Sequence, residues 1–403
     1  MLSENALESL IQEIVDRQEA INMFVIQLIA KRVKSIGKLL PSDAYKLERM
    51  LKTGSDVRKI NKELSKKTKL NADAIKNIIK TVAKEAYLDT KPFYDYRQKS
   101  FIPFEENEPL QRVVKAIARV TSDTYVNLSN ARAFMIRDRK NPKKLKPTDI
   151  AKTYYSVVDE AVQAVQSGVV DYNTAMRRTM TQLSESGIRT VTYHPEGGGT
   201  YTQQMDVAVK RNILDGVRQI NQAVQDITGE QYGADGKEIT VHEMPAPDHE
   251  PVQGHQFTNE EYDKLQNDEP FKDVNGRSFT AIKRAIGTYN CRHFTYSIIV
   301  GVNKPNFTEE QLEKIKERNQ KGYTDKSGKH RTLYECTQEQ RKFERQIRQA
   351  KRDIMTAQSS GDTEMEDKAR AKLSQKQKEY KAFSEACGIS RKMNNCKVAG
   401  FKK

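Results

Sequence analysis

Apolar residues recur at helical spacing through the first hundred residues, which predicts a helical N-terminal region. Residues 7–15 and 21–28 carry apolar side chains three and four positions apart, as in a helix with one buried face. The run Pro41-Ser42-Asp43 is typical of a helix start, because serine and aspartate oxygens accept hydrogen bonds from unpaired first-turn amides. We expect this helix to be short and to end at Gly54, and a further helix to begin at Asn71. Residues 1–104 are therefore predicted as one helical region.

A second helical region is predicted over residues 105–231. An extended connection with two prolines, residues 90–104, precedes it. Repeated apolar positions predict helices over residues 109–134, 148–166, 172–186 and 202–227. Gly187 is a natural stop for the third of these, because glycine adopts the left-handed conformation that often closes a helix. The run Gly197-Gly198-Gly199 lacks the lysine and hydroxyl residue of a phosphate-binding loop, so we expect a flexible link.

The pattern changes at Tyr232, where helical periods become rare. Short β-branched runs at residues 238–242 and 295–300 predict strands, and a short helix is expected to begin near Thr258. Residues 232–305 are therefore predicted as a compact α+β unit with a small sheet.

Helical periodicity returns over residues 306–403, which are predicted to form a basic helical hairpin. The run Thr308-Glu309-Glu310-Gln311 resembles a capping box at a helix start. Two long polar helices, residues 337–358 and 362–387, are separated by a turn short enough to impose an antiparallel hairpin. Their narrow apolar stripe suits docking on a partner or on the chain's own compact unit. The predicted fold class is therefore α+β, predominantly α-helical.

Composition and charge add constraints on the core and on partners. The chain has 403 residues, 36% of them hydrophobic, with no tryptophan, so we expect no single large core. The net charge of +15 favours an anionic partner such as nucleic acid, and is equally compatible with a solvated basic surface. Four cysteines without a CxxC pair indicate free thiols in a reducing compartment. Without a signal peptide or an apolar run long enough for a bilayer, we expect synthesis in the cytoplasm and no membrane partner.

The densest positive segment lies between the first two predicted helices of the middle region. A loop with prolines presents charges without rigid spacing, which suits contact with phosphates and not the reading of bases. We expect non-specific contact with double-stranded DNA there, with solvation or an acidic protein surface as the alternatives. The candidate residues are Arg137, Arg139, Lys140, Lys143, Lys144 and Lys146.

Two short motifs lie in the compact unit. Asp248-His249-Glu250-Pro251-Val252-Gln253-Gly254 is followed by a loop and short helix, and then by Gly287-Thr288-Tyr289-Asn290-Cys291-Arg292-His293. Their order resembles the phage minor capsid protein 2 family, which is similar to the Mu-type minor head proteins. The segments 167–188 and 207–217, and the run from Tyr334 to Arg348, also resemble the family, so the likeness covers residues 105–395. The glycine-rich run 194–199 and Pro247-Asp248, where the family often has Cys-Arg, depart from its pattern.

The resemblance implies a structural protein of a tailed-phage head. Such a protein is present in few copies, lies near the portal and acts in head morphogenesis or genome packaging. Its implied partners are the portal protein or the major capsid protein, and its implied location is the virion, assembled in the host cytoplasm. The resemblance implies no reaction, no cofactor and no small-molecule substrate.

The polar residues of the two motifs allow three interpretations. We favour a structural motif made of Asp248, His249, Gly254, Asn290, Cys291, Arg292 and His293. In it, Arg292 braces carbonyls or the Asp248 carboxylate, and His249 is paired with a backbone carbonyl. A zinc site is the second interpretation, since His249, His255, Cys291 and His293 are zinc-ligand types, although their spacing is irregular.

The third interpretation is enzymatic. A phage-encoded nuclease or toxin-like hydrolase could use Asp248, His249, Arg292 and His293. We expect instead that the protein is not an enzyme, because a small core braced by polar side chains accounts for the same residues. A host-type DNA-binding protein is disfavoured by the lack of a helix-turn-helix or zinc-finger signature.

Overall fold

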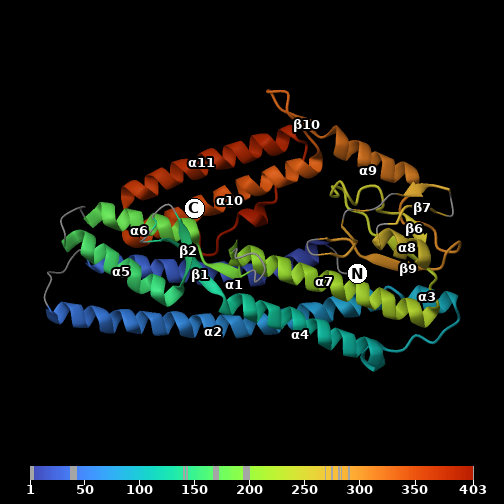
Figure 1. The fold of residues 1–403 in the computed structure, drawn as a ribbon, viewed down its shortest axis with the longest axis horizontal. Helices are drawn as coiled ribbons and strands as arrows, with labels where there is room; N and C mark the ends of the chain where they lie inside the picture. Colours follow the sequence, from blue (N-terminus) through green and yellow to red (C-terminus); the bar gives the residue numbers. More distant parts are fainter. Residues whose placement is uncertain are drawn as a thin grey trace.

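The computed structural model describes residues 4–36, 43–138, 141, 144–166, 172–193, 200–267, 269–273, 276–279, 282, 284–288 and 291–402. It confirms the predicted class, a mostly helical α+β fold with small antiparallel sheets. Figure 1 shows long helices in the body of the molecule, the compact α+β unit at one end, and the C-terminal hairpin along one side. Gly197-Gly198-Gly199 lies outside the described residues, so the expected link there stays a prediction.

The body is built from six helices around one core. They are α1 (Glu4–Ile36), α2 (Asp43–Leu88), α4 (Glu108–Asn130), α5 (Ile150–Gln166), α6 (Tyr172–Ser186) and α7 (Met205–Tyr232). All six, with strand β1, contribute buried apolar side chains to one cluster that runs from Ile11 to Val224. The expectation of no single large core is therefore wrong. Aliphatic residues fill this core with few aromatic side chains among them.

The N-terminal helices are longer than predicted, because α2 is one helix of 46 residues. Gly54 does not end it, and Asn71 does not begin a new helix. Asn71 lies fully buried in the middle of α2, where its Nδ2 donates to the Tyr125 hydroxyl (3.1 Å) and its Oδ1 accepts from Arg17 (3.0 Å). These tertiary hydrogen bonds satisfy the amide, so it need not cap the backbone.

The segment after α2 was predicted to be extended, but part of it is helical. It contains α3 (Lys91–Tyr96), with proline in its first turn, and the 3-10 helix η1 (Phe104–Glu106). Helix α4 then stops at Asn130, four residues before the predicted end, because the chain turns at Ala131 into a strand.

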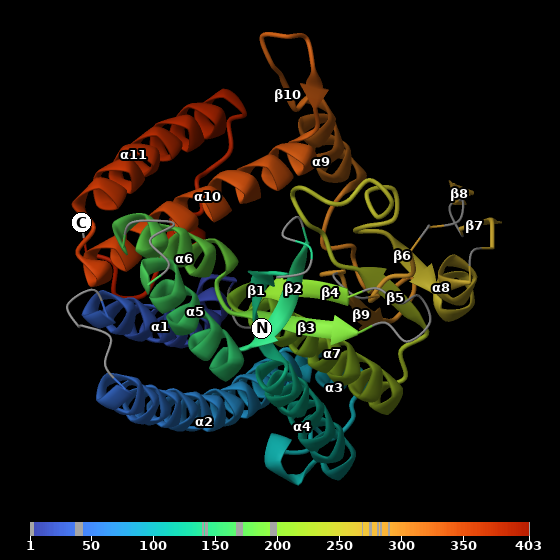
Figure 2. The same cartoon turned by 60° about the vertical axis from the view of Figure 1, so that its left-hand side comes forward.

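A four-stranded antiparallel sheet lies against the helical body and was not predicted. Its strands are β1 (Arg132–Arg137), β2 (Leu145–Asp149), β3 (Arg189–Tyr193) and β4 (Thr200–Gln204), in the order β2-β1-β3-β4 (Figure 2). The expected basic loop is thus the connection of the β1–β2 hairpin. Pro147 is accommodated because β2 is an edge strand, where a residue without an amide hydrogen leaves no partner unpaired. Helices α5 and α6 end as predicted, and Gly187 follows α6 with φ +56°.

The main sheet of the compact unit contains the two predicted strands and one that was missed. This sheet has the order β6-β5-β9, from β5 (Gly236–Ile239), β6 (Gln256–Thr258) and β9 (Thr295–Ile298). The predicted short helix is α8 (Asn259–Gln266), which begins with a Thr258 capping box. A two-stranded pair, β7 (Phe271–Lys272) and β8 (Ser278–Phe279), completes the unit. Its own buried apolar cluster is small and includes Ile239, Val252 and Phe257.

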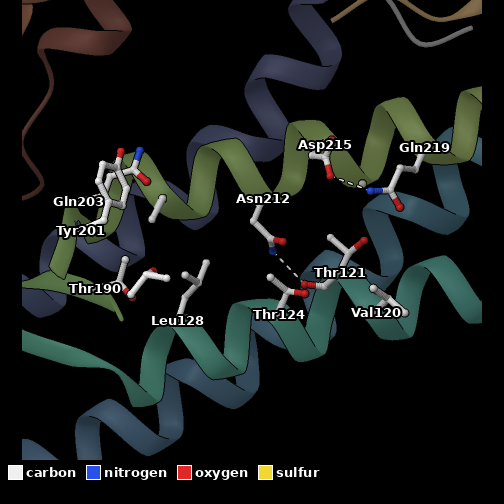
Figure 3. Close-up of a pocket in the computed structure, with 13 residues that line it drawn as sticks. Val120, Thr121, Thr124, Leu128, Thr190, Tyr201, Gln203, Asn212, Asp215 and Gln219 are labelled. Atoms are coloured by element: carbon white, nitrogen blue, oxygen red, sulfur yellow. Dashed lines mark hydrogen bonds between the residues drawn. The ribbon is translucent and has the colours of Figure 1, made fainter. Parts of the chain in front are cut away.

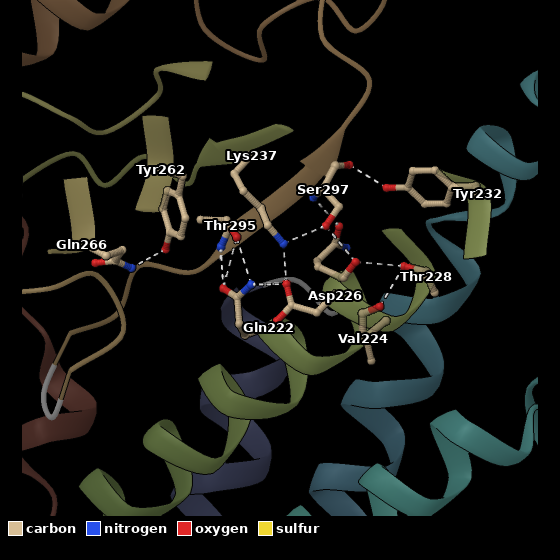
Figure 4. Close-up of polar contacts among 11 residues, drawn as sticks. Gln222, Val224, Asp226, Thr228, Tyr232, Lys237, Tyr262, Gln266, Thr295 and Ser297 are labelled. Atoms are coloured by element: carbon tan, nitrogen blue, oxygen red, sulfur yellow. Dashed lines mark hydrogen bonds and ion pairs between the residues drawn. The ribbon is translucent and has the colours of Figure 1, made fainter. Parts of the chain in front are cut away.

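Polar side chains of α7 attach the compact unit to the body (Figure 4). The Gln222 Oε1 accepts from the Thr295 amide (2.9 Å), and the Tyr232 hydroxyl donates to the Ser297 carbonyl (2.6 Å). Lys237 of β5 pairs with Asp226 of α7. Helix and sheet approach closely at Gly229, where a Cβ atom would lie 2.6 Å from Ser297 Oγ.

The C-terminal region forms the predicted hairpin. After α9 (Glu309–Lys321) and the short pair β10 (Tyr323–Thr324) and β11 (His330–Arg331), the hairpin helices are α10 (Leu333–Ser360) and α11 (Thr363–Ala386). A last 3-10 helix, η2 (Met393–Cys396), follows. Gly361 closes α10 in the left-handed conformation, with φ +74°.

The hairpin docks on its own chain through α10. A buried ion pair joins Arg352 of α10 to Glu19 of α1, with nitrogen–oxygen distances of 2.6 and 2.9 Å. The turn between α10 and α11 is tied to α6, since Arg177 Nε donates to Asp362 Oδ2 (2.5 Å). Residues separated by more than 150 positions in the sequence are thereby held together.

Candidate functional site

The first sequence motif forms a tight loop between β5 and β6. The amides of His249 and Glu250 both donate to the Ala246 carbonyl, and the Gln253 amide donates to the His249 carbonyl. Gly254 ends the loop with φ +75°, and its amide donates to the Ile239 carbonyl of β5 (2.8 Å). A Cβ atom at Gly254 would lie 2.5 Å from Leu312, so glycine is needed both for the backbone conformation and for the contact with α9.

This loop and the segment before β9 bring three chemically active side chains together. The Nδ1 atoms of His249 and His293 lie 3.3 Å apart, and Cys291 Sγ lies 3.5 Å from the first and 3.6 Å from the second. All three side chains are buried, with exposed fractions of 1% for His249, 7% for Cys291 and 3% for His293. We call His249, Cys291 and His293 the His/Cys cluster.

The other nitrogens of the two rings are held by oxygen atoms. His249 Nε2 lies 2.9 Å from the Arg284 carbonyl, which confirms the prediction that a backbone carbonyl pairs with this ring. His293 Nε2 lies 3.4 Å from Gln253 Oε1, which also accepts from the His242 amide (2.9 Å). The His242 ring packs edge-on against His293, with 4.4 Å between ring centroids.

Burial and mutual contact shift the ionisation of the cluster. Burial lowers the pKa of His293 to about 3, and the nearby rings of His242 and His249 add to the effect. Burial raises the pKa of the Cys291 thiol, but contact with His249 outweighs it and the net shift is downward. For His249, burial lowers the pKa, and its contacts with Cys291 and the Arg284 carbonyl raise it by more.

The structure separates the other predicted motif residues from this cluster. Asp248 lies at its edge, and two hydrogen bonds join it to Arg284 (2.8 and 3.0 Å). The predicted brace from Arg292 is therefore wrong: Arg292 is exposed and makes no hydrogen bond or ion pair with the described residues. His255 lies elsewhere, beside Arg277 (3.0 Å) and Glu309 (3.5 Å). Asn290 lies outside the described residues.

Sequence reasoning missed three residues around the cluster. Arg284, Gln253 and His242 hold or cover the motif residues, and neither Arg284 nor His242 belongs to a recognisable local pattern. Gln253 lies within the first motif, at the fourth position after His249, so its side chain could have been included as a possible partner. The Arg284 carbonyl carries no sequence signal, because any residue supplies one.

Three of the predicted DNA-contact residues are described, and they lie in the β1–β2 hairpin, near its connection. Arg137, Lys144 and Lys146 are exposed, and Lys146 lies 4.0 Å from Asp138. The other three candidates, Arg139, Lys140 and Lys143, fall outside the described residues.

A longer basic surface follows helix α2. Seven exposed lysines lie along one face of the helix, three or four positions apart except between Lys69 and Lys76, where Asp73 interrupts the series. We call them the α2 lysine stripe: Lys59, Lys62, Lys66, Lys69, Lys76, Lys80 and Lys84. Only Lys76 and Lys84 have a carboxylate partner among the described residues, at 3.8 Å (Asp73) and 2.8 Å (Glu105). The opposite face of α2 is buried in the core, so packing fixes which way the lysines point.

A cavity of about 490 Å³ lies between α4, α7 and the β3–β4 hairpin (Figure 3). Its walls are mostly small, hydroxyl and amide side chains, and Asn212 Nδ2 donates across it to the Thr121 carbonyl (2.8 Å). Asp215 is the one carboxylate among its lining residues, and Gln219 and Arg218 hold it at 2.6 and 3.3 Å. The lining therefore offers no paired acid and base of the kind that hydrolysis requires.

The comparisons with known proteins identify the class. The family described as phage minor capsid protein 2 matches residues 2–385, so the chain belongs to that family. It is accordingly a structural protein of a phage head, located in the virion and in contact with other head proteins. Neither the comparison with curated proteins nor that with solved structures found a match. Within the described ranges, none of the helices carries an apolar stretch long enough to cross a bilayer.

Proposed function

We propose that this minor capsid protein acts in head morphogenesis near the portal and contacts the packaged DNA without sequence preference. The α2 lysine stripe carries the DNA part of the proposal. A helix rises about 1.5 Å per residue, so the stripe extends over roughly 38 Å of rigid surface. Repeated positive charges along one helix face, mostly without carboxylate partners, suit an array of phosphates.

A charge-reversal experiment tests DNA contact. The variant Lys62→Glu/Lys66→Glu/Lys69→Glu removes three stripe lysines, so binding of unrelated duplexes should weaken equally. If those three lysines each neutralise one phosphate, the slope of log affinity against log salt should fall by about 2.7. The matched control, Lys314→Glu/Lys316→Glu/Lys368→Glu, changes the net charge equally but replaces lysines that are already paired with glutamates. Equal loss of binding in both variants would show that only net charge matters, and would refute DNA contact by the α2 lysine stripe.

The location near the portal rests on the family resemblance. We expect a low copy number in purified heads and cross-links to the portal protein or to the major capsid protein. Quantitative mass spectrometry of gradient-purified particles, with and without cross-linking, measures both. Absence of the protein from every particle type would refute a head function, and cross-links confined to sites distant from the portal would refute its placement there.

Burial of the His/Cys cluster supports a structural role over the alternative of a nuclease or hydrolase. A nucleophile or base must reach its substrate, whereas the three cluster side chains are at most 7% exposed. Purified protein should therefore leave DNA, RNA and phosphodiester model substrates intact. Hydrolysis that is lost on His249→Ala, in a variant with an unchanged melting temperature, would contradict this.

A further inference from the structure

The three ligand atoms of the His/Cys cluster form a triangle with sides of 3.3, 3.5 and 3.6 Å. In tetrahedral zinc sites, bonds of about 2.0–2.1 Å to nitrogen and about 2.3 Å to sulfur place two nitrogens about 3.3–3.4 Å apart, and nitrogen and sulfur about 3.5–3.6 Å apart. The observed triangle has the shorter side between the nitrogens and the longer sides to sulfur. It matches one face of a zinc tetrahedron in size and in the order of its sides.

The tautomers of both rings direct lone pairs into this triangle. Carbonyl and amide oxygens only accept hydrogen bonds, so each Nε2 that lies beside one carries its hydrogen. Gln253 presents its oxygen to His293, because that oxygen also accepts from the His242 amide. With hydrogen on Nε2, the Nδ1 atom of each neutral ring has a lone pair. Outer oxygen partners of this kind are usual for metal-bound histidines.

Without a cation, these lone pairs would oppose each other. Two Nδ1 lone pairs face one another at 3.3 Å, and the single proton of the Cys291 thiol can satisfy only one of them. A divalent cation would accept all three donors at once and favour the thiolate, as zinc does with cysteine ligands.

We propose that His249 Nδ1, His293 Nδ1 and Cys291 Sγ bind one zinc ion as a structural site of the compact unit. Among the described residues, no fourth His, Cys, Asp or Glu side chain joins the group, which leaves the remaining position to water. Burial of all three ligands separates this site from catalytic zinc centres, whose open position faces substrate.

The site would link two segments of the compact unit that lie far apart in the sequence. It joins the loop after β5 to the segment that leads into β9, next to an apolar cluster of seven buried residues. Such a small core gains from a metal cross-link, because little apolar surface is available to hold its loops together.

Metal analysis of the intact chain tests the proposal. Protein purified without chelators should contain one zinc per chain by elemental mass spectrometry. Replacement by cobalt should give the visible absorption of a tetrahedral site and a near-ultraviolet thiolate band. Cys291→Ser should lose that band and its bound metal on dialysis, and Gln253→Ala should weaken zinc binding about 10- to 100-fold. The controls His255→Gln and Cys336→Ser should keep the zinc and the band.

A measurement on the wild-type protein tests the proposal even if the ligand variants fail to fold. A chelator should lower the melting temperature of the wild type, and zinc should restore it while magnesium should not. A wild type that is free of zinc, takes up no cobalt and melts identically with a chelator would overturn the proposal. The cluster would then be held by a proton shared between His249 and Cys291.

Discussion

At the scale of single residues, one buried ion pair joins the C-terminal hairpin to α1. Arg352 is 2% exposed and is paired with Glu19, while Asp206 lies 3.9 Å away. Burial lowers the pKa of the arginine, but Glu19 raises it by more, so the guanidinium stays charged. A buried ion pair adds little net stability over an apolar pair, yet removing one partner leaves a charge without compensation.

Arg352→Met should therefore lower the free energy of unfolding by about 3–5 kcal/mol. The double variant Glu19→Leu/Arg352→Met should recover much of this loss, because it removes both charges. Lys314→Met, at an exposed ion pair, should change stability by less than about 1 kcal/mol. Urea denaturation of the four proteins measures these values, and a double variant less stable than Arg352→Met would contradict the explanation.

Residue patterns predicted part of the site. The two motifs were recognised, and the pairing of His249 with a carbonyl was expected from the preference of buried rings for a partner. The convergence of three of four suspected ligands could not be derived, since it depends on how the loop and the β9 segment meet. Arg292 was assigned the role of Arg284, because nothing in the sequence indicates which of two arginines faces Asp248.

At the scale of elements, helix length was the main error in the N-terminal region. Glycine and asparagine inside a helical pattern were interpreted as boundaries, but α2 runs through both positions, and its apolar face continues across Asn71. Strands β3 and β4 were missed although Thr190, Val191 and Thr192 are β-branched, because both runs are short and only the pairing of β3 with the distant strand β1 joins this hairpin to the rest of the sheet. The compact unit and the hairpin helices, with clear strand runs and caps, were predicted well.

Two glycines in helices should respond oppositely to alanine. A Cβ atom at Gly54 would meet nothing within 4 Å, so Gly54→Ala should stabilise the protein by about 0.5–1 kcal/mol. At Gly229 the added carbon would press on Ser297, so Gly229→Ala should destabilise by about 1–3 kcal/mol. Thermal melts compare both with the wild type. A destabilising Gly54→Ala would indicate that α2 is interrupted there after all.

The contact between α6 and α11 should depend on pH. Burial raises the pKa of Asp362, but the Arg177 guanidinium outweighs it and holds the pKa below its usual value. A depressed pKa stabilises the fold above the unfolded value of about 3.9, and this contribution is lost as pH falls through the folded value. Asp362→Asn should therefore cost about 1.5–3 kcal/mol at neutral pH, and less below about pH 3. The exposed Asp367→Asn should show neither effect, and a cost independent of pH would contradict the assignment.

At the scale of the whole molecule, the two ends of the chain complete one body. Helix α1 contributes to the main core on one side and contacts α10 on the other, where Met23 packs with Met355 and Val398. Sequence patterns predicted a hairpin that docks somewhere, but not its site, because the apolar stripe of α10 is complementary to several helices. The structure identifies the partner as α1, through Arg352 against Glu19 and Met355 against Met23.

Removal of α10 and α11 should reverse the effect of one substitution. In the full chain, Glu19→Gln breaks the buried pair and should destabilise by about 3–5 kcal/mol. In a chain truncated after residue 332, the same substitution removes an unpaired carboxylate and should raise the soluble fraction. Expression of the four proteins side by side measures this. A loss of solubility in both lengths would show that Glu19 has another partner.

Glu19 and Arg352 are 333 residues apart in the sequence, so Glu19 is synthesised well before its partner. At about 5–20 residues per second, the ribosome delivers the arginine roughly 15–70 seconds after the glutamate. Throughout that interval, the nascent N-terminal helix has an acidic side chain that cannot be buried at low cost. Only a fully translated polypeptide can close its body, so prematurely terminated copies would be left open to proteases and excluded from a growing particle.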